Sequence, residues 1–132
     1  MIGIIVITHA QLGQELINAA EFILGKIERI VSLDVASQSQ NQEIQSRLEA
    51  AIRQMESGDG VLILTDMFGG TPNNVSLAFW AAGRVEVVTG VNLPMLIKAA
   101  TSREGKSLSD LGREVCDAGK ESISVAGELL SI

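Results

Sequence analysis

Length, composition and charge limit the classes of protein to which this chain can belong. At 132 residues it is expected to form one domain over residues 1–132, with an aliphatic core, because 46% of its residues are apolar and only 3% aromatic. Its net charge of −6 argues against a nucleic-acid-binding protein. The single cysteine, Cys116, excludes an intramolecular disulfide, and without a signal peptide or a long apolar run the chain is expected in the cytoplasm.

The first half of the chain alternates between strand and helix patterns. Ile2–Thr8 is a continuous, largely β-branched run, typical of a strand buried on both faces, and the helical pattern after it ends at Gly25. Ile30–Val35 alternates more, which favours a strand at a sheet edge. A polar loop follows over Ala36–Gln42, and Ile44–Met55 has the spacing of an amphipathic helix.

The middle of the chain carries a strand, a glycine turn and the start of a helix. Val61–Leu64 is too short for a helix and predicts a buried strand, which is followed by Asp66. The Gly69–Gly70 pair predicts a tight turn. Thr71 is then the expected N-cap of a helix, with Pro72 at its first position. This arrangement leaves free backbone N–H groups that could bind an anion.

The second half continues the alternation and ends on a different pattern. Four elements are expected there in order: a helix through Ala82, a strand over Val85–Thr89, a helix from Asn92 through Ala100, and a helix capped by Ser107. Glu121–Val125 then alternates as an edge strand does, and a short tail covers Gly127–Ile132.

The order of these elements predicts the fold class and brings two residues together. We expect an α/β protein: a three-layer α/β/α sandwich around a doubly wound, mainly parallel sheet of order 2-1-3-4, with a C-terminal antiparallel edge strand. Such sheets bind ligands beyond the carboxyl ends of their strands. His9, after the first strand, is therefore expected beside Asp66, after the third.

His9 and Asp66 together suggest nucleophilic chemistry. His9 is the only histidine in the chain. A carboxylate that accepts from its Nδ1–H would fix the tautomer and leave Nε2 free as a nucleophile. Each residue alone also fits a structural role, His9 as a strand-end histidine bonded to a carbonyl and Asp66 as a turn-capping residue.

Gly69, Gly70 and Thr71 complete the candidate site. The glycines would let backbone N–H groups approach a phosphoryl group, and the Thr71 hydroxyl could donate to it as well as cap the helix. With His9, the set suggests a transient phosphohistidine. Neither nucleotide-binding fingerprint occurs, and one His with one Cys does not make an ordinary zinc site, so no metal and no cofactor are expected.

Three segments resemble one known family, the mannose-type EIIA domain of the bacterial phosphoenolpyruvate:sugar phosphotransferase system. They are Ile4–His9, Asp66–Asn74 and Thr89–Leu96, in the family's order and spacing. One departure is Phe68, which stands where the family often has tryptophan. The resemblance implies that the chain is an EIIA phosphotransferase subunit and leaves peripheral association with a membrane permease complex open.

The resemblance also implies roles and partners. His9 would accept a phosphoryl group from HPr and pass it to a separate EIIB component, Asp66 would hydrogen-bond the imidazole, and Gly70 and Thr71 would help to bind the phosphoryl group. A homodimer is implied, in which Glu121–Val125 would be the strand that pairs with the partner's sheet, and exchange of this strand between the two copies stays open. A different hypothesis stays open: a regulatory protein in which phosphorylation of His9 controls binding to a protein partner. A small-ligand-binding domain is a third, and the sugar itself is not indicated.

Overall fold

The computed structural model describes residues 1–131, and Ile132, the last residue of the expected tail, lies outside the described residues. Strands and helices alternate over most of the chain. The elements are β1 (Gly3–His9), α1 (Leu12–Leu24), β2 (Ile30–Val35), α2 (Asn41–Met55), β3 (Val61–Thr65), α3 (Thr71–Leu77), β4 (Val85–Thr89), α4 (Leu93–Ser102), α5 (Leu108–Glu121) and α6 (Ala126–Leu130).

The sheet has the predicted order and direction. Its strands run β2-β1-β3-β4, every neighbouring pair is parallel, and β1 and β3 are central. The register places Ile7 of β1 opposite Thr65 of β3 and His9 opposite Val35 of β2. The carboxyl ends of β1 and β3 therefore meet at the same edge of the sheet, as the sequence predicts.

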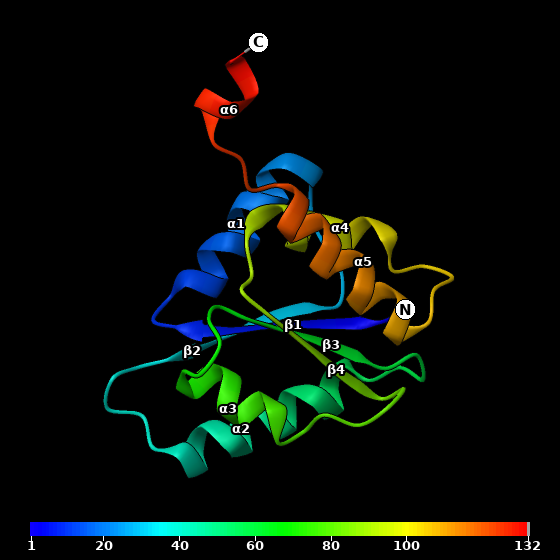
Figure 1. Cartoon of the computed structure of the whole chain (residues 1–132). Coiled ribbons are helices and arrows are strands. Elements are labelled where there is room, and N and C mark those ends of the chain that lie inside the picture. The colour runs from blue at the N-terminus through cyan, green and yellow to red at the C-terminus, as the bar shows by residue number, and fades with distance from the viewer. Residues whose placement is uncertain (132) are drawn as a thin grey trace.

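Helices cover both faces of the sheet. α1, α4 and α5 lie on one face, and α2 and α3 on the other (Figure 1). Alternate residues of β1 belong to two separate cores, with Ile4 and Val6 on the first face and Ile5 and Ile7 on the second. This burial on both faces explains why β1 and β3 are continuous apolar runs, and it makes the molecule the expected three-layer sandwich.

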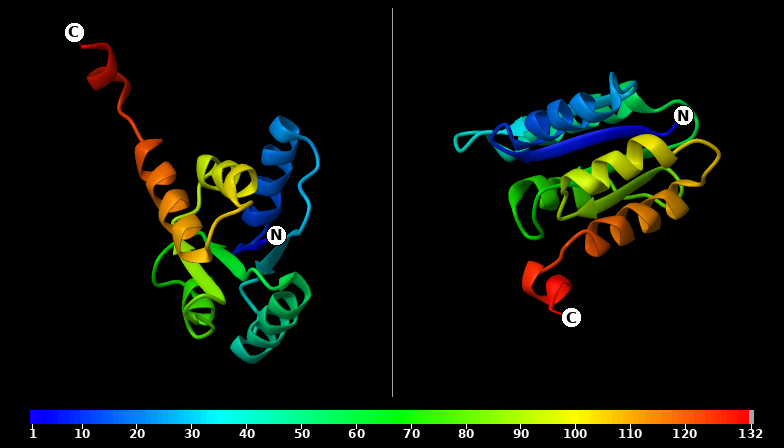
Figure 2. Two further views of the ribbon diagram at one scale, coloured as in Figure 1. Left: turned by 90° about the vertical axis from the view of Figure 1, so that its right-hand side faces the viewer. Right: turned by 90° about the horizontal axis from the view of Figure 1, so that it is seen from above.

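The predicted C-terminal edge strand is wrong for the part of the chain that the structure describes. α5 continues to Glu121, no strand forms after it, and the short helix α6 follows Val125. Figures 1 and 2 show this segment extending away from the layers. Alternation predicts a strand only where a neighbour can supply hydrogen bonds, and this segment lies beside no strand of the described chain.

The helix after the glycine turn is shorter than predicted. It was expected to run through Ala82, but α3 ends at Leu77, where the Phe79 N–H bonds the Ser76 carbonyl in a turn. Ala81 already pairs with Val85, so the chain has to leave the helix to enter β4. At its other end Gly70 is the N-cap, and Thr71, the predicted cap, is the first helical residue.

A buried arginine ties three segments together at the opposite edge of the sheet. The guanidinium of Arg103 is 4% exposed and donates to the carbonyls of Ile2, Arg29 and Glu28. Burial, together with the charge of Arg29, lowers the pKa of Arg103. The side chain nevertheless stays charged at neutral pH, because arginine does not deprotonate in proteins.

Replacing Arg103 is expected to destabilise the fold without touching the candidate site. Arg103→Leu removes a donor from three carbonyls, although the Arg29 carbonyl keeps the Ile4 N–H, and we expect a loss of about 3 kcal/mol in the free energy of unfolding, measured by urea denaturation. Arg53→Leu is the matched control, since the Arg53 side chain is 75% exposed and, within residues 1–131, forms an ion pair with Glu49 alone. A loss there as large as for Arg103 would contradict the role of burial.

Candidate functional site

His9 ends the central strand β1 with its side chain 48% exposed. Ala10, the next residue, has a positive φ of 50°, and its N–H bonds the Val35 carbonyl at 2.9 Å. The chain therefore turns sharply after His9 and enters α1 at Leu12. An exposed imidazole on a central, buried strand combines a rigid support with access from outside.

Asp66 lies directly against His9, as predicted. Its Oδ2 accepts from the His9 backbone N–H at 2.9 Å and lies 2.8 Å from the ring Nδ1, while its Oδ1 accepts from the Met67 N–H at 3.0 Å. The Asp66 side chain is only 11% exposed. A carboxylate accepts but does not donate, so in the neutral imidazole Nδ1 carries the proton and Nε2 keeps a free lone pair.

Gly70 is packed against the free side of the same ring. A Cβ added there would lie 2.7 Å from His9 Cε1 and 3.2 Å from Nε2. Its φ of −85° and ψ of 172° are extended values that any residue can adopt. Close approach to the imidazole, and not backbone conformation, is therefore what requires glycine at this position.

Gly69 and Thr71 flank Gly70 but differ in their surroundings. Gly69 has a φ of 88°, and nothing would lie within 4 Å of an added Cβ, so its backbone conformation makes the turn. Thr71 begins α3 and, like His9, lines a pocket of about 880 Å³. The structure thus gathers His9, Asp66, Gly70 and Thr71 at the carboxyl edge, with Gly69 one residue further out.

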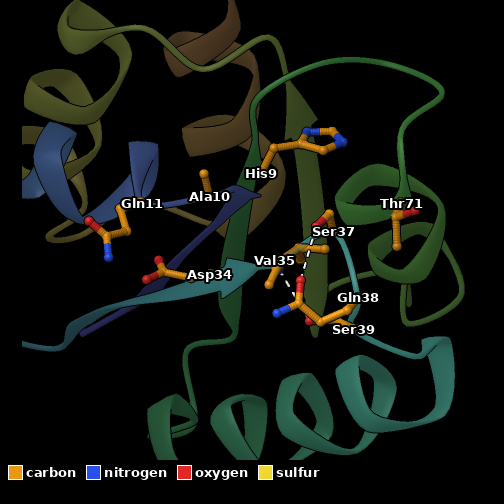
Figure 3. A pocket seen from close by; sticks show the side chains of 10 residues that line it. His9, Ala10, Gln11, Asp34, Val35, Ser37, Gln38, Ser39 and Thr71 are labelled. Atoms are coloured by element: carbon orange, nitrogen blue, oxygen red, sulfur yellow. Dashed lines mark hydrogen bonds between the residues drawn. The ribbon is translucent and has the colours of Figure 1, made fainter.

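The pocket contains residues that the sequence did not point to. Figure 3 shows most of them around His9 and Thr71: Ala10, Gln11, Asp34, Val35, and the loop residues Ser37, Gln38 and Ser39. Ala36 of the same loop also lines the pocket. The polar loop was predicted as a loop, but nothing local to it indicated a place beside His9. The pairing of β1 with β2 puts it there.

The part of the chain that the structure describes contains no cluster of metal-binding side chains. Within residues 1–131, no three or more His, Cys, Asp or Glu side chains gather closely enough to hold a metal ion. Asp34 lines the pocket, and its buried Oδ1 has no hydrogen-bond partner in the part of the chain described here.

Known proteins share both the sequence and the fold. Residues 3–116 match the family EIIA-man, described as the PTS system fructose IIA component. The fructose-specific EIIA component of Bacillus subtilis is 29% identical over 131 residues, which cover 98% of this chain and 90% of that protein.

A longer relative and a solved structure agree with this match. The mannose-specific EIIAB component of Escherichia coli is 28% identical over 130 residues, covering 92% of this chain but only 38% of that protein. An EIIA crystal structure from Streptococcus agalactiae superimposes with a TM-score of 0.88 at 28% identity, covering 97% of this chain and 99% of the other.

Proposed function

The chain belongs to the EIIA-man family, the EIIA components of the sugar phosphotransferase system, and on that premise we propose that it carries a phosphoryl group on Nε2 of His9. The observation that supports this most directly is the 2.8 Å contact between His9 Nδ1 and Asp66, because it leaves Nε2 as the free nucleophile. HPr would be the donor and a separate EIIB component the acceptor.

The transfer exchanges one P–N bond for another. The lone pair of His9 Nε2 attacks phosphorus, the bond to the imidazole nitrogen of phospho-HPr breaks, and that nitrogen leaves with the electron pair. Such a reaction depends mainly on positioning and on stabilising charge on the phosphoryl oxygens. We assign the second task to the Thr71 hydroxyl and the backbone N–H groups of Gly70 and Thr71, with Gly69 shaping the turn.

A phosphorylation assay tests the proposal. The purified protein is incubated with phosphoenolpyruvate, enzyme I and HPr, and its intact mass is measured. We expect a gain of one phosphoryl group that is lost in acid. Subsequent loss of the group to an EIIB component would support the transport role. Retention in the presence of every EIIB tested, with a protein partner bound only in the phosphorylated state, would favour the regulatory alternative.

Asp66→Asn is expected to slow phosphorylation of His9 about 10- to 100-fold. Three N–H groups point at the Asp66 carboxylate, two at Oδ2 and one at Oδ1. Whichever of these positions the asparagine NH₂ group occupies, it faces at least one N–H donor that it cannot accept from. The rate is measured under single turnover with phospho-HPr. Asp59→Asn is the control, because Asp59 is an exposed carboxylate that forms an ion pair with the amino terminus. Equal rates for parent and Asp66→Asn would remove Asp66 from the mechanism.

We also propose that the chain forms a homodimer through its C-terminal arm, residues 122–131. Four large apolar side chains of this arm are 61% to 77% exposed: Ile123, Val125, Leu129 and Leu130. Such a concentration of exposed apolar surface is typical of an interface, and a second copy is the occupant that the family resemblance implies. The contact is proposed for these side chains and not for a strand.

Removal of the arm is expected to yield a monomer. Light scattering should give twice the chain mass for the full-length protein and the single mass for a chain that ends at Glu121. The truncated chain should keep its fold, because the arm contributes no residue to either core. A full-length monomer would contradict the proposal.

The proposed place of action is the cytoplasm, with peripheral contact to a permease complex. No helix among the described residues is long and apolar enough to cross a membrane. The net charge of −6 would favour encounter with partners that present basic surfaces.

A further inference from the structure

The turn that carries His9 is fixed at three points, one of which lies outside the candidate site. The His9 N–H bonds Asp66, the Ala10 N–H bonds the Val35 carbonyl at 2.9 Å, and the Gly13 N–H bonds the Thr8 hydroxyl at 2.8 Å. Thr8 is 0% exposed and directly precedes His9. Its hydroxyl therefore connects the end of β1 to the first turn of α1.

This bond replaces a cap that α1 lacks. The N-cap residue Gln11 makes no side-chain capping bond, so the Gly13 N–H has the Thr8 hydroxyl as its acceptor instead. The helix passes close to the strand at this point, since a Cβ added to Gly13 would lie 3.2 Å from the Thr8 hydroxyl oxygen and 3.1 Å from Val6. Because α1 lies so close to β1, Ala10 and Gln11 have to connect His9 to Leu12 over a short distance.

Ala10 covers this span in a strained conformation. Its φ of 50° lies in the left-handed region, which is unfavourable for a residue that carries a Cβ. Such strain persists only where the surrounding hydrogen bonds enforce it. Here the Ala10 N–H bonds the Val35 carbonyl, and the bond from the Gly13 N–H to the Thr8 hydroxyl joins the residues before and after Ala10. The strained residue is adjacent to His9.

We propose that Thr8 and Ala10 are positioning residues for phosphoryl transfer: the buried Thr8–Gly13 bond holds Ala10 in its strained turn, and this turn presents the His9 ring to Asp66 and Gly70. The inference rests on the proposed function, since it assigns these residues to the reaction of His9.

Thr8→Val tests the first half of the proposal. It keeps the shape of the side chain and removes the acceptor, and Thr8→Ser restores the acceptor. With phospho-HPr under single turnover, we expect Thr8→Val to lower the rate at saturation about tenfold, with the half-saturating HPr concentration unchanged, and Thr8→Ser to recover most of it. Thr101→Val is the control, because the Thr101 hydroxyl bonds within the exposed surface of α4.

Ala10→Gly tests the second half and does not depend on the folding of Thr8→Val. Glycine adopts a φ of 50° without strain, so the variant should unfold at the same or higher urea concentration than the parent. It should nevertheless transfer more slowly, because the turn gains other conformations. A merely structural role for Ala10 would leave the rate unchanged.

A second measurement separates this inference from the proposed function. The ¹⁵N chemical shifts of His9 report its ring tautomer without any phosphorylation. In the parent we expect one tautomer, protonated at Nδ1, and in Thr8→Val a mixture of both. Parent-like shifts and rates in Thr8→Val and Ala10→Gly would overturn the inference alone, whereas a parent protein that HPr does not phosphorylate would overturn the proposed function.

Discussion

His9→Ala should abolish phosphorylation by HPr, with no acid-labile mass gain at any time. His9 is the only histidine in the chain, so no second imidazole can take its place. The effect is the largest expected from any single substitution, because the bond that carries the phosphoryl group cannot form. Intact-mass spectrometry after incubation with phosphoenolpyruvate, enzyme I and HPr measures it.

The same variant should remain folded, which makes the loss interpretable. The His9 side chain is 48% exposed, and an alanine keeps the backbone N–H that bonds Asp66. We therefore expect the free energy of unfolding to change by less than about 1 kcal/mol. An acid-labile phosphoryl group on a folded His9→Ala protein would show that another residue is the acceptor.

Gly70→Ala should reduce the rate of phosphorylation about 100-fold while the protein stays folded. The added Cβ would lie 2.7 Å from His9 Cε1, so the ring has to move away from its position against Asp66. Alanine accepts the extended backbone of Gly70, and the substitution therefore adds no backbone strain. The rate comes from single turnover with phospho-HPr and the stability from urea unfolding.

Gly127→Ala is the matched control for Gly70→Ala. It makes the same chemical change at a glycine where an added Cβ would meet nothing within 4 Å. It should leave the rate close to that of the parent. Because Gly127 lies in α6, within the arm proposed as the dimer contact, it is a control for the rate and not for stability. A parent-like rate for Gly70→Ala would mean that the ring can shift and still react, and the proposed geometry around Nε2 would then be wrong.

Much of the fold could be predicted from local patterns. Continuous apolar runs predicted β1 and β3 as central strands, the more alternating Ile30–Val35 predicted an edge strand, and the alternation of strands and helices predicted a parallel sheet, all of which the structure has. The errors lie where an element depends on its neighbours. α3 ends early because Ala81 pairs with Val85, and the expected strand at Glu121–Val125 lies beside no partner strand in the described chain.

The site was predicted in its members but not in its contacts. Strand-end positions and the parallel sheet were enough to expect His9 beside Asp66, although they are 57 residues apart. No pattern in the sequence indicated that Gly70 approaches the ring, that Ala10 takes a positive φ, or that the loop after β2 borders the pocket. These features depend on how closely separate segments approach one another.

The sequence by itself determined which residues of this protein are the candidates for its chemistry and at which edge of the sheet they lie. Hydrophobic periodicity and turn residues determine the structure of the few positions around them, so they can be recognised in a short stretch of sequence. Only the tertiary structure decided how the His9 ring is held between Asp66 and Gly70, and that Thr8 anchors its turn. Contacts of this kind result from the close packing of distant segments, and a small change in that packing alters them without changing any local sequence pattern.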